Sequence, residues 1–91
     1  MNKTAVLLTC FNRKKDTLKC LNQLFFLSQE IDVYVVDDNS SDGTSAAILK
    51  KHPDVHIIKG NGDLFWSRGM HLAWEHASKH KYDFYLWLND D

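Results

Sequence analysis

The chain has 91 residues, of which 44% are hydrophobic and 25% are charged, a composition that is typical of a globular domain and excludes intrinsic disorder. Its formal net charge of −1 provides no basic field to hold nucleic acid. No apolar run approaches the roughly 20 residues of a membrane span, and no signal-peptide pattern precedes the first predicted strand. We therefore expect a cytoplasmic protein with reduced cysteines.

Strand and helix patterns alternate along the sequence. A continuous apolar run predicts a buried strand over residues 4–9. Apolar residues at helical spacing then predict a helix that Asp16 caps. Ser41 or Asp42 is placed to cap a second helix, which ends before Pro53 because the residue preceding proline leaves helical geometry. The remaining patterns predict strands over residues 32–37, 55–59 and 82–88, and helices over about 46–51 and 66–79.

This alternation implies right-handed crossovers and a mostly parallel sheet covered on both faces. We predict an α/β protein with a Rossmann-like three-layer α/β/α fold, a strand order of 3-2-1-4, and one domain over residues 1–91. The sequence ends at the acidic tip of the last predicted strand, which leaves sheet edges open. We expect a fragment of a larger protein, truncated at that tip, whose exposed edges can support self-association.

Polar residues gather where the predicted strands end. Ligands of a doubly wound sheet bind outside the carboxyl ends of the strands, where the strand order reverses. This rule brings residues 9–12, 37–39 and 89–91 to one crevice. Two acidic pairs then share it, Asp37 with Asp38 and Asp90 with Asp91. Four carboxylates cannot all ionise in a confined volume unaided, and Mg²⁺ or Mn²⁺ would both neutralise them and attract a diphosphate.

Several candidate residues have a structural alternative. Asp42 fits a helix cap, and Asp37 either contacts a ligand or only holds its loop by bonding backbone amides. Arg68, one turn into the last predicted helix, is either solvated or a phosphate contact. His76 and His80 share a helix face but have no third ligand in view, so a solvated face is favoured over a zinc site.

Three segments resemble the N-terminal half of family 2 glycosyltransferases with the GT-A fold. They are residues 6–13 (VLLTCFNR), 35–44 (VVDDNSSDGT) and 88–91 (LNDD), the last resembling the family's DxD metal motif with asparagine first. Residues 60–70 (GNGDLFWSRGM) are similar to the rhamnosyltransferase-like branch. That resemblance implies a role in the biosynthesis of cell-surface polysaccharides.

The resemblance also implies roles for individual residues. Thr9, Phe11 and Asp38 would hold the nucleotide base, Asp90 would touch the ribose, and Asp91 would bind Mg²⁺ or Mn²⁺ on the diphosphate. Asn12, Asp37 and Arg68 complete the expected nucleotide-sugar site. Family members usually invert the anomeric centre with a carboxylate that activates the acceptor hydroxyl. That base lies beyond the DxD-like motif, so we expect no catalytic residue within this chain and little or no turnover by it alone.

The expected partners are a dTDP-, UDP- or GDP-linked sugar and a saccharide or lipid-linked acceptor, which would place a full-length protein in the cytoplasm or at the inner face of the membrane. One alternative is a non-catalytic receiver-like module with an acidic Mg²⁺ cluster, but its acidic residues would follow strands one and three. A sugar-nucleotide pyrophosphorylase would need a glycine-rich basic loop after strand one, and residues 10–15 contain no glycine.

Overall fold

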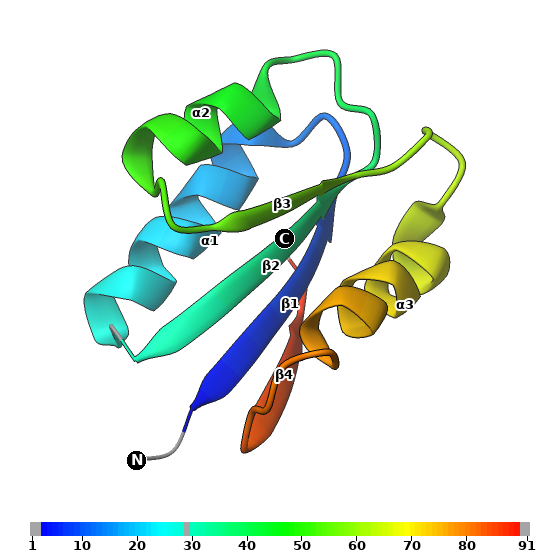
Figure 1. Cartoon of the computed structure of the whole chain (residues 1–91). Coiled ribbons are helices and arrows are strands. Elements are labelled where there is room, and N and C mark those ends of the chain that lie inside the picture. The colour runs from blue at the N-terminus through cyan, green and yellow to red at the C-terminus, as the bar shows by residue number, and fades with distance from the viewer. Residues whose placement is uncertain (1–2, 29, 90–91) are drawn as a thin grey trace.

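Four parallel strands form one sheet in the order β3-β2-β1-β4 in the computed structural model, which describes residues 3–28 and 30–89. This order and the parallel pairing confirm the predicted topology. The helices connect successive strands, as Figure 1 shows. In chain order the elements are β1 (Thr4–Cys10), α1 (Lys14–Leu27), β2 (Ile31–Asp37), α2 (Thr44–Lys51), β3 (His56–Lys59), α3 (Phe65–Ala77) and β4 (Phe84–Leu88).

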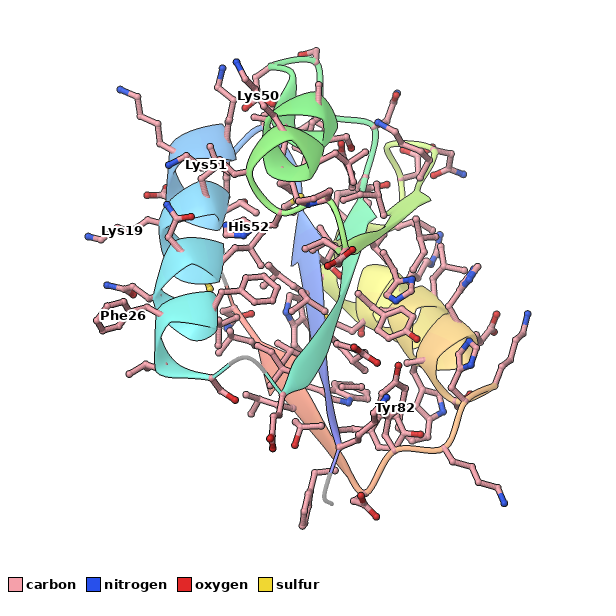
Figure 2. All side chains as sticks on the ribbon, turned by 60° about the vertical axis from the view of Figure 1, so that its left-hand side comes forward. Lys19, Phe26, Lys50, Lys51, His52 and Tyr82 are labelled. Carbon is pink, nitrogen blue, oxygen red and sulfur yellow. The ribbon has the colours of Figure 1, made fainter. Side chains whose placement is uncertain are left out.

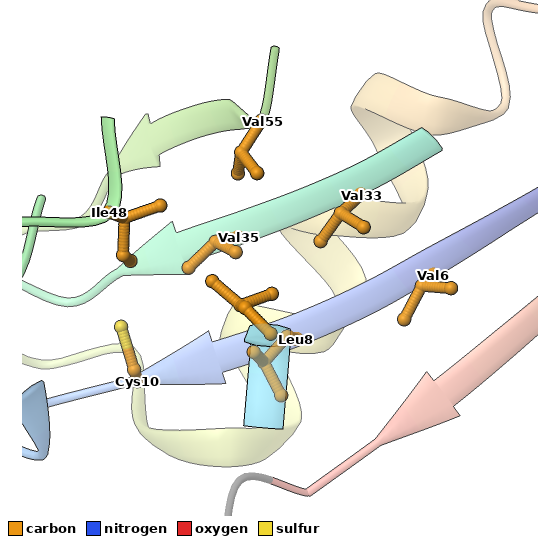
Figure 3. Packing of buried hydrophobic residues seen from close by; sticks show 8 residues of the cluster. Val6, Leu8, Cys10, Val33, Val35, Ile48 and Val55 are labelled. Atoms are coloured by element: carbon orange, nitrogen blue, oxygen red, sulfur yellow. The ribbon is translucent and has the colours of Figure 1, made fainter. Parts of the chain in front are cut away.

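The sheet separates two apolar cores. Alternate residues of β1 and β2 point to opposite faces, so Leu8 and Val35 pack under α1 and α2, whereas Leu7 and Val36 pack under α3. Figure 3 shows the α1–α2 side, where Ile48 of α2 closes over the strands. Because both faces are covered, the central strands are apolar throughout, as the continuous runs in the sequence indicate.

The prediction that Asp16 caps α1 is wrong. The helix begins two residues earlier, at Lys14, and Asp16 instead pairs with Arg13 at 3.0 Å. The Lys14 amide donates to the carboxylate of Asp42, 3.1 Å away in the loop before α2. The same carboxylate accepts the Thr44 amide at 3.1 Å. Asp42 therefore accepts hydrogen bonds from the first amides of both α1 and α2. A local sequence pattern could reveal only its contact with α2, which follows it directly in the chain.

β4 lies at one edge of the sheet and β3 at the other. The side chains of Phe84, Leu86 and Trp87 on β4 are 45 to 56% exposed, and at the end of α1 Phe26 points into solvent (Figure 2). The predicted self-association through sheet edges stays a prediction. Over residues 3–28 and 30–89, none of the helices has the length and apolar character to cross a bilayer.

Candidate functional site

Two loops are tied together at the carboxyl ends of β1 and β2. The Asn12 amide donates to the Ser40 hydroxyl at 2.8 Å, and the Asn12 side-chain oxygen accepts the Ser41 amide at 2.7 Å. Asn12 itself adopts a left-handed conformation, with φ of 51°, which asparagine tolerates better than most residues. Asn12 therefore joins the two loops that border the predicted crevice.

Asp37 is fully buried, and its partners come from the loop that follows β2, from α2 and from β3. Its carboxylate accepts the Ser40 amide at 2.9 Å and the Ser45 hydroxyl, and the Lys59 ammonium lies 3.3 Å away. Burial by itself raises the pKa of Asp37, but the hydrogen bonds from Ser40 and Ser45 and the charge of Lys59 outweigh it, so the pKa lies below its usual value. These bonds match the loop-holding alternative for Asp37.

Asp38 is 3% exposed, and its carboxylate faces the loop that leads into α3. One oxygen, Oδ1, accepts the amides of Gly62 at 2.8 Å and Leu64 at 3.3 Å. The other, Oδ2, accepts the amides of Leu64 and Phe65, each at 3.1 Å. Amides at the start of a helix have no hydrogen-bond partner within the helix. A negatively charged carboxylate there also interacts favourably with the positive end of the helix dipole. Asp38 thus joins the end of β2 to the start of α3.

A small pocket of about 180 Å³ opens beside these loops. Thr9, Phe11 and Asp38, the three residues assigned to the nucleotide base, all line it. Its volume is below the roughly 300 Å³ at which ordinary ligand pockets begin, so it suits one planar ring rather than a whole nucleotide. The complete lining consists of Thr9, Cys10, Phe11, Arg13, Asp38, Gly62, Phe65 and Trp66.

The other predicted site residues lie outside this pocket. Asn12 and Asp37 support the adjoining loops, and Arg68 is an exposed residue of α3. Asp90 and Asp91 lie outside the described residues, so the predicted ribose and metal contacts have no geometry here. Across residues 3–28 and 30–89, no three histidine, cysteine or acidic side chains are grouped to hold a metal ion.

Sequence reasoning missed Phe65 as a site residue. Phe65 is 73% exposed, adopts a left-handed φ of 56°, and lines the pocket together with Trp66. A signal was present, since two adjacent aromatic residues at the start of a predicted helix point in different directions and cannot both be buried under it.

Sheet order and pocket position together define a class of protein. A parallel α/β sheet whose pocket lies outside the carboxyl ends of its strands, next to the β1–β4 switch in strand order, is the arrangement of Rossmann-like nucleotide-binding proteins. The chain belongs to glycosyl transferase family 2, whose family model matches residues 5–91. Among curated protein sequences, none matches it significantly.

Solved structures share the fold at low sequence identity. TarS from S. aureus (residues 1–349) has a TM-score of 0.72 and 23% identity, over 98% of this chain and 27% of that one. The mannosyltransferase PcManGT from Pyrobaculum calidifontis, in complex with GDP-Man and Mn²⁺, has a TM-score of 0.69 and 21% identity, over 82% of this chain and 24% of that one.

A third structure is glucosyl-3-phosphoglycerate synthase from Mycobacterium tuberculosis, in complex with Mn²⁺, UDP and glucosyl-3-phosphoglycerate. Its TM-score is 0.67 at 15% identity, over 99% of this chain and 34% of that one. The chain therefore spans about a quarter to a third of the length of these neighbours. The likeness shows the GT-A form of the Rossmann-like fold, as predicted.

Proposed function

We propose that this chain is the donor-binding half of a glycosyltransferase that transfers a sugar from a nucleoside diphosphate to an acceptor hydroxyl. The observation that carries the proposal is the pocket between the end of β1 and the start of α3, which brings Thr9, Phe11 and Asp38 together. Two aromatic side chains, Phe11 and Trp66, line a space of single-ring size, and aromatic faces are favourable surfaces for nucleobases. We assign this pocket to the base of the nucleotide.

The remaining contacts of the donor follow from where the strands end. β4 runs beside β1, with Leu88 in register with Leu8, so the residues after Leu88 follow a strand next to β1, whose end lines the pocket. We propose that Asp90 contacts the ribose there and that Arg68 approaches the diphosphate as a cation. Asn12 and Asp37 support the site by holding its loops.

We also propose that a divalent metal ion binds at the donor site. The neighbours from Pyrobaculum and Mycobacterium were crystallised with Mn²⁺. The resemblance of residues 88–91 to the DxD metal motif assigns the role of metal ligand to Asp91. When bound, Mg²⁺ or Mn²⁺ would offset the charge that develops on the departing nucleoside diphosphate.

The finer specificity is proposed from sequence likeness. Residues 60–70 favour the rhamnosyltransferase-like branch and a dTDP-linked donor. The resemblance to the family as a whole favours a saccharide or lipid-linked acceptor and inversion at the anomeric carbon. We place the protein in the cytoplasm or at the inner face of the membrane. Because the acceptor-activating base is assigned to sequence beyond the DxD-like motif, residues 1–91 alone should bind a donor without turning it over.

Titration of the chain with UDP, dTDP and GDP, each with and without Mn²⁺, tests the donor site. Tryptophan fluorescence is a suitable readout because Trp66 lines the pocket and is 47% exposed. We expect saturable binding of at least one nucleotide, strengthened by the metal. An Asp91→Ala variant should lose only the metal-dependent part of the affinity, whereas Asp38→Ala should weaken binding under both conditions. Absence of binding by all three nucleotides, with metal present, would overturn the proposal.

A further inference from the structure

We propose that the groove between β3 and the end of α3 is an anion site that accepts a phosphate group. This β3–α3 groove has a volume of about 540 Å³, which lies within the range of ordinary ligand pockets. None of its lining residues is acidic. Its basic residues are His56 and Lys59 from β3, His76 from α3, and Lys79 and His80 from the turn that follows α3. The inference goes beyond the donor site, and it does not depend on the proposed function.

The first step is the chemistry of the donors that line the groove. Lys79 has an ammonium with three N–H donors, and a histidine ring has at least one N–H donor in either neutral tautomer. Lys79 and the three histidines therefore bring donors from two different elements to one groove. A phosphate group offers several strong acceptor oxygens and negative charge, and hydrogen bonds from an ammonium to phosphate are charge-assisted. The groove suits such an anion better than a neutral ligand.

The second step is that the nearby carboxylates are engaged elsewhere. Asp37 pairs with the Lys59 ammonium at 3.3 Å, so Lys59 adds no free charge to the groove. On α3, Glu75 contacts the ring of His71 at 2.9 Å, and neither residue lines the groove. Asp32 accepts the Tyr82 hydroxyl at 2.7 Å.

Lys79 supplies the net positive charge of the groove. Within residues 3–28 and 30–89 it forms no ion pair. An anion could therefore pair with Lys79 without competing against a carboxylate of the chain. Its side chain is exposed, so water screens this attraction, and the affinity must come from the imidazole donors as well.

The third step is that His56 is held in place before any ligand arrives. Its ring stacks on Tyr34, with centroids 4.4 Å apart and ring planes 11° apart. The Tyr34 hydroxyl is in turn 2.7 Å from that of Tyr82. His56 lies on the same face of β3 as Ile58, which packs in the core under α3. A donor that is already ordered costs less to immobilise on binding.

A structural explanation accounts for only part of this cluster. Lys79 and His80 follow the last turn of α3, where the helix dipole favours cations whether or not a ligand binds. That effect does not explain His56, which comes from β3. A metal site is also unsupported, because across residues 3–28 and 30–89 no three histidine, cysteine or acidic side chains are grouped closely enough to hold an ion. Donors that are spread along a groove suit a larger anion.

Titration with inorganic phosphate, followed by nuclear magnetic resonance, tests the site. The experiment uses a fixed pH, an ionic strength balanced with chloride and no divalent metal. We expect saturable shifts of the ring signals of His56, His76 and His80. His52 and His71, the other two of the chain's five histidines, lie outside the groove and should change little. Equal shifts at all five rings would indicate charge screening alone and would overturn the inference.

A matched pair of lysine variants tests whether the groove itself binds the anion. Lys79→Gln should weaken phosphate binding several-fold. Lys50→Gln, at an exposed lysine of α2 outside the groove (Figure 2), should leave the affinity unchanged. Equal losses in the two variants would contradict a specific site. So would a phosphate response confined to the fluorescence of Trp66, because that response would place the anion in the donor pocket.

The phosphate group could belong to a soluble molecule or to a lipid headgroup, and vesicles distinguish these sources. The parent protein and Lys79→Gln are sedimented with vesicles of phosphatidylglycerol and, separately, of phosphatidylcholine. Binding to phosphatidylglycerol that Lys79→Gln weakens would identify an anionic lipid headgroup as the ligand. Binding of free phosphate without binding to vesicles would identify a soluble phosphorylated ligand. If neither free phosphate nor vesicles bind in a manner that depends on Lys79, the inference is wrong.

Discussion

Gly69 of α3 lies directly against Thr9 of β1: a β-carbon at Gly69 would be 2.4 Å from Thr9 Cγ2 and 2.6 Å from Thr9 Oγ1. Only a residue without a β-carbon lets the helix lie this close to the Thr9 side chain. Within residues 3–28 and 30–89, the Thr9 hydroxyl is buried and finds no hydrogen-bond partner. This contact determines how far α3, and with it the aromatic wall of the pocket, stands from the end of β1.

Substitution of Gly69 by alanine should destabilise the protein. Overpacking typically lowers the free energy of unfolding by about 1–3 kcal/mol, while the higher helix propensity of alanine returns up to ~1 kcal/mol. We expect a net loss of up to about 2 kcal/mol in chemical denaturation. Adding Thr9→Ala removes Cγ2 and Oγ1 and should restore part of the loss, a coupling that a double-mutant cycle measures. Equal effects of Gly69→Ala in both backgrounds would contradict the contact, and Ser67→Ala, at an exposed position of the same helix, is the control.

Tyr82 connects a buried hydroxyl to a carboxylate. It donates to Asp32 Oδ2 at 2.7 Å and therefore accepts from Tyr34, whose hydroxyl is also 2.7 Å away. Burial, together with the hydrogen bonds to Tyr34 and Asp32, raises the pKa of Tyr82, so it remains a donor at neutral pH.

Tyr82→Phe should lower the free energy of unfolding by about 1–3 kcal/mol, because it leaves the Tyr34 hydroxyl without its acceptor. Tyr85→Phe is the matched control, since the Tyr85 hydroxyl makes only a long, exposed bond of 3.4 Å to the His80 carbonyl. Urea denaturation of both variants measures the difference. Similar losses in the two variants would show that the Tyr34–Tyr82–Asp32 chain contributes nothing specific.

Asp37 should make the protein sensitive to acid. Its folded-state pKa lies below the ordinary value of 3.8, so the unfolded chain binds a proton at a higher pH than the folded one does. Stability from this group is fully present above pH values near 4, falls as the pH drops toward the folded pKa, and is gone below it. Denaturation midpoints measured across this range should fall more steeply for the parent protein than for Asp37→Asn, which has no proton to bind. Parallel curves would contradict this assignment.

His52 should titrate below its ordinary pKa of 6.5. Burial lowers the pKa of His52, and the charge of Lys51 lowers it further. The ring stacks on Phe25 with centroids 4.7 Å apart and contacts the Asn22 side chain at 2.7 Å, so it points back to α1 (Figure 2). Nuclear magnetic resonance titration should give a midpoint below 6.5, and Lys51→Gln should raise it. A midpoint at or above 6.5 would contradict this environment.

Much of the fold could be predicted because its signals are local. The apolar runs of β1 and β2 are buried on both faces, and that burial produces continuous patterns that a short window detects. The start of α1 could not be predicted, because the group that receives the Lys14 amide is Asp42, 28 residues away. Asp16 has a residue type that is common at helix caps, but it lies within the first turn of α1. The amide at the start of this helix is bound by the distant Asp42 carboxylate.

The candidate site also has features that the sequence predicts and features that only the structure shows. Motifs at the strand ends identified Thr9, Phe11 and Asp38, and parallel pairing brings the ends of β1 and β2 together whatever the side chains do. The partners of Asp38 could not be read from those motifs. Its carboxylate accepts hydrogen bonds from backbone amides 24 to 27 residues away, and backbone amides carry no sequence signature.

By itself, the sequence determined the order of the elements, the sheet topology and the family, because hydrophobic periodicity and strand-end motifs are properties of contiguous residues. Only the tertiary structure decided what each carboxylate does. Asp42 accepts hydrogen bonds from the first amides of α1 and α2. Asp37 pairs with Lys59, and Asp38 accepts the Phe65 amide at the start of α3. The physical reason is that a carboxylate takes whichever donors the folded chain brings within about 3 Å, and in this protein those donors come from distant parts of the chain.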